Sequence, residues 1–280
     1  MQLFLSSEQR EQFEREGFLI LRALFSPSEI ASLREHFMAL HAAGPVGNLF
    51  QPKPMNEVDD ILQAYPRFMH PHRVDEISRR TMLDARYYQI LRELLGEEPI
   101  SAQSMFYWKP PGARGQALHQ DNFYLTVAPG SCYASWLALD PIDAENGGLF
   151  VVPGSHKTDL QCPHLADFSE SFAAEEVDLP AGMNPIPAAM NPGDCLFFNG
   201  SLIHGSYSNK SKNRFRRSFI CHYLGESSQQ ISRGYFPLYR FDGTPIEADE
   251  IYAAVDEGGV CGSEDWQKLQ HARGSEVTLA

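Results

Sequence analysis

Short apolar segments separated by turn residues fill the chain from residue 100 to residue 223, and this pattern limits the possible folds most. Prolines, glycines and asparagines stand between one segment and the next. Many short strands that follow a helical N-terminus are typical of a jelly roll or barrel with helices packed outside. The predicted strands cover residues 100–110, 117–125, 133–140, 148–154, 193–200, 201–206 and 215–223.

The first hundred residues predict helices instead. Ser6 and Gln9 have the spacing of a capping box, and Gly17 is a typical stop. Ser26 and Glu29 repeat the capping pattern, and the apolar residues that follow recur at helical spacing. The predicted N-terminal elements are helix 6–17, strand 18–25, helix 26–44 and helix 84–96.

Two stretches lack a clear pattern, residues 44–80 and residues 155–192. Structureless segments of such length in a compact domain usually form lids or binding loops, and we expect a short helix inside the first one. We predict a single domain over residues 1–280, mainly β with flanking helices. Its predicted parts are a helical layer and lid (1–98), a jelly-roll, cupin-like core (99–225) and a C-terminal extension (226–280).

Composition indicates which binding partners and which cellular compartment to expect for this chain. A formal charge of −13 makes nucleic acid and anionic membranes poor partners, but it says little about a small substrate, because the local field of a pocket can oppose the net charge. No apolar run is long enough for a membrane span, and the first residues do not resemble a secretory signal. The five cysteines are scattered without a C-x-x-C, which favours reduced thiols. We therefore expect a cytoplasmic monomer or homodimer.

The stretch "ALHQDNFYL" carries the first candidate metal ligands, His119 and Asp121. On a strand, residues two apart point to the same face and lie about 7 Å apart along the backbone. Two ligands cannot hold a reactive metal alone, and the best third ligand is His204 in "FFNGSLIHGS". Two histidines and one carboxylate on one face of an ion are diagnostic of non-haem Fe(II) oxygenases.

Taken together, six segments resemble the phytanoyl-CoA dioxygenase family of Fe(II)/2-oxoglutarate oxygenases. They occur in the family's order and approximate spacing between residues 100 and 223, and the N-terminal helices match more loosely. The segments are "MFYWKPPG", "LHQD", "YASWLALD", "ENGGLFVVPGSHK", "GDCLFFNGSLIHGS" and "FRRSFICHY".

This resemblance implies His119, Asp121 and His204 as iron ligands and catalytic centre, with 2-oxoglutarate and O2 as cosubstrates. Arg216 would bind the distal carboxylate of 2-oxoglutarate through a bidentate fork. Arg214 is the alternative, because the preceding loop is one residue longer than in a human family member. The other residues implied for the cosubstrate pocket are Ser206, Trp136 and Met105.

Strand alternation extends the candidate pocket. If Met105 faces inward, so do Gln103 and Tyr107, which could hydrogen-bond the cosubstrate or substrate, or simply be satisfied inside the barrel. By the same rule Ser218, Ile220 and His222 share the side of Arg216. We expect His222 to be a buried supporting residue rather than a ligand, and Lys109 to end its strand in solvent.

Other histidines are weaker candidates for a metal site. His70 and His72 have the right spacing in "HPH", but Pro71 separates them and no acidic residue matches them. His156 follows a turn, and we expect it to be structural.

The resemblance implies hydroxylation of a C–H bond of a small molecule, with release of succinate and CO2. The carboxylate of Asp121 favours hydroxylation over halogenation, because related halogenases have a small residue there. Two alternatives remain: a non-catalytic jelly-roll binding protein, and a cupin-like protein or isomerase that uses a different metal.

Overall fold

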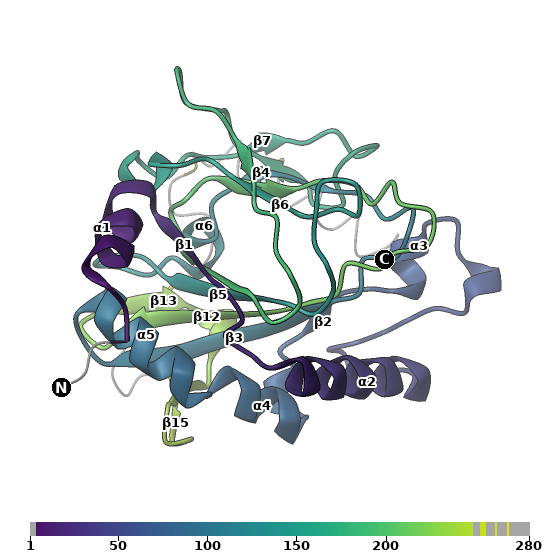
Figure 1. Cartoon of the computed structure of the whole chain (residues 1–280), viewed down its shortest axis with the longest axis horizontal. Helices are drawn as coiled ribbons and strands as arrows, with labels where there is room; N and C mark the ends of the chain where they lie inside the picture. The colour runs from purple at the N-terminus through teal and green to yellow at the C-terminus, as the bar shows by residue number, and fades with distance from the viewer. Residues whose placement is uncertain (1–3, 249–252, 256–260, 262–267, 269–280) are drawn as a thin grey trace.

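The computed structural model describes residues 4–248, 253–255, 261 and 268. Two sheets lie one above the other, with three of the helices on the outer face of the larger sheet (Figure 1). The helices are α1 (Ser7–Glu16), α2 (Pro27–Ala43), α3 (Ile61–Ala64), α4 (Glu76–Met82), α5 (Ala85–Leu95) and α6 (Asn122–Leu125). Single 3-10 turns are η1 (Met55–Glu57), η2 (Pro71–Arg73), η3 (Ser155–Lys157) and η4 (Arg233–Tyr235).

The larger sheet runs in the order β1-β10-β5-β12-β3-β14-β15, and β2 also pairs with β3. Its strands are β1 (Phe18–Leu21), β2 (Phe68–Met69), β3 (Pro99–Tyr107), β5 (Tyr133–Ala138), β10 (Cys195–Asn199), β12 (Ser218–Gly225), β14 (Leu238–Arg240) and β15 (Pro245–Ile246). All of these pairings are antiparallel. The prediction of a mainly β fold with flanking helices is confirmed.

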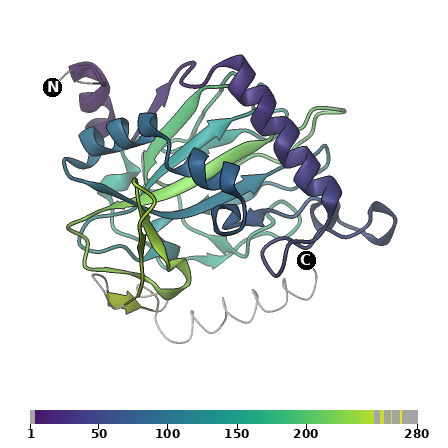
Figure 2. The ribbon, with the colours of Figure 1, turned by 90° about the horizontal axis from the view of Figure 1, so that it is seen from below.

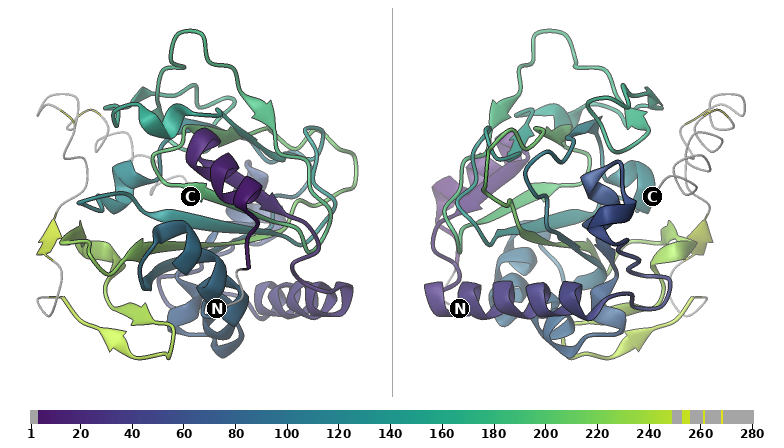
Figure 3. Two further views of the ribbon diagram at one scale, coloured as in Figure 1. Left: turned by 60° about the vertical axis from the view of Figure 1, so that its left-hand side comes forward. Right: turned by 90° about the vertical axis from the view of Figure 1, so that its right-hand side faces the viewer.

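The smaller sheet runs in the order β4-β11-β6-β9, and it carries two of the candidate metal ligands. Its strands are β4 (Gln116–His119), β6 (Leu149–Val151), β9 (Ile186–Pro187) and β11 (His204–Ser206). Two further pairs are β7 (His164–Leu165) with β8 (Glu175–Glu176), and β13 (Gln230–Ser232) with β16 (Ala253–Val255). Part of the segment between β6 and β10 rises above the smaller sheet, away from α2, whereas β9 of the same segment pairs with β6 (Figure 3).

Helices α1, α2 and α5 begin and end close to the predicted residues. Ser6 and Ser26 both form complete capping boxes, with Gln9 and Glu29 respectively. Gly17 ends α1 with a left-handed backbone (φ 82°), which a glycine adopts without strain. Helices α2, α4 and α5 then cover the outer face of the larger sheet (Figure 2).

The larger sheet separates two apolar clusters by strand alternation. Phe106 and Phe219 point to the helices, where Phe37 of α2 stacks on Phe106 with ring centroids 3.8 Å apart. Met105 and Ile220, one position away on the same strands, point to the opposite side. The alternation predicted from sequence is therefore confirmed for β3 and β12, and the second side faces the smaller sheet.

Several predicted strands are shorter than expected, and one prediction is partly wrong. The predicted strand 117–125 ends at His119, and residues 122–125 form α6 instead. The side chain of Asn122 bonds to both backbone groups of Val127, which closes a turn and competes with strand pairing. Asp121 consequently lies in a helical backbone conformation before α6, not on the strand.

The prediction that all five cysteines are reduced is wrong. Cys162, in the segment between β6 and β10, forms a disulfide with Cys261, 99 residues later in the chain. Cys132, Cys195 and Cys221 are free and buried. Spacing in the sequence cannot show that two residues so far apart meet, and the expected cytoplasmic location loses this support. The described residues contain no helix with the length and hydropathy of a membrane span.

The disulfide predicts a thiol count. Protein unfolded in denaturant without a reductant should react with a thiol reagent at three positions, because Cys162 and Cys261 are bonded. After reduction the count should rise to the five cysteines of the sequence. Five reactive thiols before reduction would contradict the bond.

The packing of α2 on the sheet predicts a large effect of one side chain. Phe37 is fully buried between Phe106 and Phe219, so Phe37→Ala should lower the free energy of unfolding by about 3–5 kcal/mol. Phe168 is 42% exposed, and Phe168→Ala should change it by no more than about 0.5 kcal/mol. Denaturant unfolding measures both, and equal effects would contradict this packing.

Candidate metal centre

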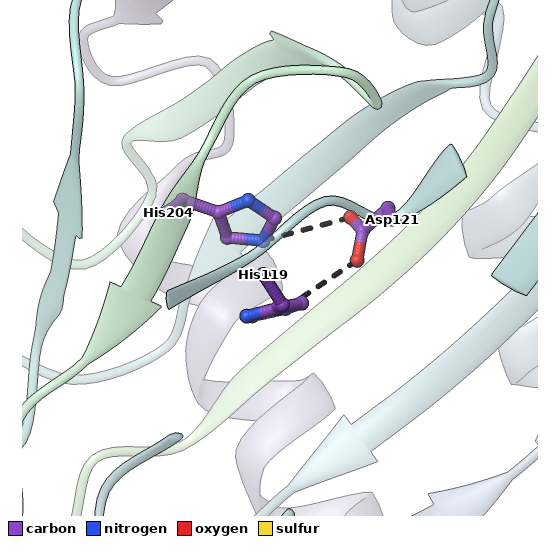
Figure 4. Close-up of side chains that lie close together, drawn as sticks. All are labelled: His119, Asp121 and His204. Carbon is purple, nitrogen blue, oxygen red and sulfur yellow. Dashed lines mark ion pairs between the residues drawn. The ribbon is translucent and has the colours of Figure 1, made fainter. Parts of the chain in front are cut away.

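The three candidate ligands converge between the two sheets. His119 ends β4 and His204 begins β11, and these two residues face each other in the strand register. Asp121 follows two residues after β4 and turns toward both imidazoles (Figure 4). One ligand atom from each residue lies within 4.8 Å of the others, and all three side chains are buried.

Backbone carbonyls fix the orientation of both imidazoles. Nδ1 of His119 bonds to the carbonyl of Ala117, and Nδ1 of His204 bonds to the carbonyl of Leu202, each at 2.9 Å. Because a carbonyl only accepts, both Nδ1 atoms carry a proton, and in the neutral form of each ring the Nε2 atom has the free lone pair that a metal needs. The Nε2 atoms of His119 and His204 lie 3.5 and 3.6 Å from the Asp121 carboxylate. This arrangement could hold a metal ion.

The protonation states of His204 and Asp121 also suit metal binding. Burial, with the nearby His119, lowers the pKa of His204 to about 4, so its ring is neutral near pH 7. Burial opposes the ionisation of Asp121, but His204 and His222 outweigh it and keep the pKa of this carboxyl well below its ordinary value. Neutral imidazole and ionised carboxylate are the forms that bind metals.

His222 supports the carboxylate from behind. Its Nε2 lies 2.9 Å from Oδ2 of Asp121, and the ring is buried on β12. The hydrogen bond orients the Asp121 carboxylate toward the two imidazoles. On the other side, the amide nitrogen of Gln116 lies 3.1 Å from Nε2 of His119, so Gln116 borders the position that a metal would take.

Two buried cations lie beside this centre, and neither has a carboxylate within 4 Å in the part of the chain that the structure describes. Arg216 donates to the carbonyl of Gly147 at 2.9 Å and to the Ser218 hydroxyl at 2.8 Å. The ammonium of Lys109 donates to the hydroxyl of Ser206 at 2.8 Å. Burial, reinforced by Arg216, lowers the pKa of Lys109 well below its ordinary value. An uncompensated buried charge is costly, so this pocket fits an anion.

The three neighbouring arginines have different surroundings. Arg214 forms exposed ion pairs with Asp143 and Glu145. Arg217 pairs with Asp140 at 2.7 Å. Arg216 alone of the three is buried without a carboxylate within 4 Å among the residues described, so it is the arginine best placed to receive one.

The remaining pocket candidates lie around Arg216. Its guanidinium stands 5.2 Å from the ring centre of Trp136 and 5.8 Å from that of Tyr107. Tyr107 donates to the Met105 sulfur at 3.7 Å. Gln103 is buried opposite His222 in the β3–β12 register, nearer to the metal centre.

Sequence reasoning placed Lys109 in solvent, and this is wrong because Lys109 is buried. Its backbone has a positive φ of 38°, which turns the side chain inward, and Gly147 leaves the space for it. A Cβ on Gly147 would lie 2.7 Å from Cε of Lys109. The glycine pair in "ENGGLF" was the signal that could have revealed this packing.

The competing histidines lie elsewhere. His72 bonds to the hydroxyl of Ser104 at 2.7 Å, and burial lowers its pKa to about 2. Burial also lowers the pKa of His70 to about 3. His156 packs near α1, with Nε2 3.2 Å from the carbonyl of Glu14. The described residues contain no other group of three potential ligands besides His119, Asp121 and His204.

Comparison with known proteins is consistent with this geometry. The chain is 25% identical over 238 residues to phytanoyl-CoA dioxygenase 1 of Oryza sativa, covering 74% of this chain and 85% of the relative. It is 28% identical over 249 residues to peroxisomal phytanoyl-CoA dioxygenase of Bos taurus (81% and 71%). It is also 28% identical over 226 residues to ectoine dioxygenase of Sphingopyxis alaskensis (73% and 71%).

Solved structures of EctD from S. alaskensis share the fold. The structure with bound Fe matches with a TM-score of 0.66 and 25% identity, covering 80% of this chain and 78% of that one. The structure with 2-oxoglutarate and 5-hydroxyectoine matches with a TM-score of 0.69 and 22% identity (90% and 88%). The family model described as phytanoyl-CoA dioxygenase (PhyH) matches residues 13–218. The chain therefore belongs to the phytanoyl-CoA dioxygenase family.

Proposed function

We propose that this chain hydroxylates a C–H bond of a small molecule, with iron(II) held by His119, Asp121 and His204. Membership of the family makes it an iron- and 2-oxoglutarate-dependent oxygenase. The observation that carries the site assignment is the convergence of two Nε2 atoms and one ionised carboxylate, each oriented by a further hydrogen bond.

The donor set fits ferrous iron. Two neutral imidazoles and one carboxylate leave the opposite face of an ion open for other ligands. In a structural zinc site four protein ligands usually close the coordination sphere, whereas the described residues bring only three together here. The group therefore fits a reactive centre better than a structural one.

Arg216, Lys109 and Ser206 are proposed to bind the distal carboxylate of 2-oxoglutarate. Arg216 offers a planar fork, Lys109 a second cation, and Ser206 a hydroxyl already bonded to Lys109. Trp136, Met105 and Tyr107 would form the wall beside the carbon chain, and Gln103 would lie closer to the ion. The cosubstrate dianion would then compensate the two buried cations.

When bound, iron(II) with 2-oxoglutarate and O2 supplies the oxidation that inserts one oxygen atom into a C–H bond and the other into succinate, with loss of CO2. The chain contributes orientation and exclusion of water. His222 holds the Asp121 carboxylate, and carbonyls hold the two imidazoles. Because the Asp121 carboxylate occupies the position that is open in halogenases, we propose hydroxylation rather than chlorination.

Small-molecule substrates are typical of the relatives, whose names specify phytanoyl-CoA or ectoine. Three further properties stay predictions: a cytoplasmic location, a monomeric or homodimeric state, and the absence of nucleic-acid and membrane partners. The single domain over residues 1–280, with its three parts, is a prediction as well. In the structure β1 and β2 from the predicted helical layer pair with core strands.

The metal assignment predicts a spectroscopic result. Anaerobic protein with Fe(II) and 2-oxoglutarate should show a weak visible charge-transfer band and, when air is admitted, should form succinate. His119→Ala should lose both signals, because one Nε2 ligand is gone. His156→Ala, with its ring on the carbonyl of Glu14, should keep both. A band that survives His119→Ala would contradict the assignment.

The cosubstrate assignment predicts a separation of two affinities. Arg216→Ala should weaken 2-oxoglutarate binding by about 2–4 kcal/mol, or about 30- to 1,000-fold, because it removes a buried charge-assisted pair. Fe(II) binding should change little, since Arg216 does not contact the three ligands. Arg214→Ala serves as the matched control and should leave 2-oxoglutarate binding near the wild-type value. The reverse order would assign the role to Arg214.

A further inference from the structure

A third cation, Arg67, lies near residues of the candidate site. It directly precedes β2, in which Phe68 pairs with Phe106 and Met69 pairs with Met105. Phe68 packs into the cluster under the helices, whereas Met69 packs on the cluster that faces the smaller sheet. By strand alternation Arg67 lies on the same side as Met69, the side of the candidate site.

The neighbours of Arg67 connect both halves of the site. The guanidinium of Arg67 donates to the hydroxyl of Tyr107, whose ring lies 5.8 Å from Arg216. Arg67 also interacts electrostatically with Tyr124, whose ring centre is 6.3 Å from that of His119. Arg67 therefore neighbours one residue of the proposed cosubstrate pocket and one residue beside His119, and it is itself exposed.

The charge of Arg67 is not paired. No carboxylate of the described residues lies within 4 Å of it, whereas Arg214 and Arg217 each form an ion pair. Glu175 acts on Arg67 only from a greater distance, and its Oε2 accepts a hydrogen bond from Tyr124 at 3.2 Å. Once Asp121 serves the metal and the cosubstrate occupies Arg216 and Lys109, Arg67 still lacks a carboxylate within 4 Å among the described residues, and its exposure leaves it accessible to a ligand.

We propose that Arg67 binds a carboxylate of the substrate, so that the substrate is a small amphipathic acid. A guanidinium fork matches a planar carboxylate, and the anion would supply the close acidic partner that Arg67 lacks among the described residues. Phe172, 6.2 Å from the ring of Tyr107, and Met69 offer apolar surface for the rest of the molecule. This inference rests on the proposed function, because it assigns the cosubstrate to Arg216.

Binding to matched carboxylates and amides tests this role without catalysis. Anaerobic protein loaded with Fe(II) and 2-oxoglutarate is titrated with octanoate, octanamide, phenylacetate and phenylacetamide, and binding is followed by calorimetry and thermal stability. The wild type should bind a carboxylate at least about tenfold more tightly than its amide, since only the carboxylate gains a charge-assisted pair. Arg67→Gln should abolish this preference, and Arg67→Lys should retain part of it.

Arg80→Gln is the matched control, because Arg80 is an exposed arginine on α4, and it should behave as the wild type. Affinity for 2-oxoglutarate should stay within about threefold of wild type in Arg67→Gln, since a different arginine is assigned to it. Loss of 2-oxoglutarate affinity comparable to that in Arg216→Ala would overturn the proposal and place Arg67 in the cosubstrate pocket. A wild type without carboxylate preference, or a preference that survives Arg67→Gln, would also overturn it.

The visible band separates the two levels of inference. If the wild type gives no charge-transfer band with Fe(II) and 2-oxoglutarate, the proposed function itself fails. If the band is normal and the carboxylate preference is absent, only the role of Arg67 fails.

Discussion

The site depends on the contacts of the Asp121 carboxylate, because its oxygens lie close to the Nε2 atoms of His119, His204 and His222. Each neighbour comes from a different element: β4, β11 and β12. A buried carboxylate is stable only when hydrogen bonds and opposite charges compensate its desolvation. The same arrangement that would bind a cation therefore also joins the smaller sheet to the larger one. Side chains that serve chemistry here also contribute to the contact between the sheets.

Charge is distributed unevenly between the surface and this interior. The chain as a whole carries a formal charge of −13, yet Arg216 and Lys109 are buried near the metal centre, and Arg67 lies close to Tyr107 on the same side of the sheet. Local field, not net charge, decides which ligands a pocket accepts. The buried cations suit an anionic cosubstrate, because desolvated positive charges stabilise a bound anion even though the chain as a whole is acidic. The low pKa of Lys109 shows the cost of burying such a charge without its anion.

Much of the fold and the centre of the site could be predicted from sequence, because those features depend on local pattern. Capping boxes placed α1 and α2, and strand alternation placed Met105 and Ile220 opposite Phe106 and Phe219. Features that depend on contacts between residues far apart in the sequence could not be predicted. The bond of His222 to Asp121 and the burial of Lys109 beside Gly147 belong to this class. The helical turn after His119 was missed because the side-chain bonds of Asn122 outweigh the apolar pattern of the stretch.

The bond between Cys162 and Cys261 has a practical consequence for handling an iron enzyme of this kind. Cys162 and Glu175 both belong to the segment between β6 and β10, here called the insertion. Glu175 accepts a hydrogen bond from Tyr124, whose ring lies near His119. Thiol reductants, often added to keep iron ferrous, exchange with disulfides, whereas ascorbate keeps iron ferrous without supplying a competing thiol. Preparations made with the two reagents would therefore contain different covalent forms of the chain, in which the insertion is either tethered to Cys261 or released from it.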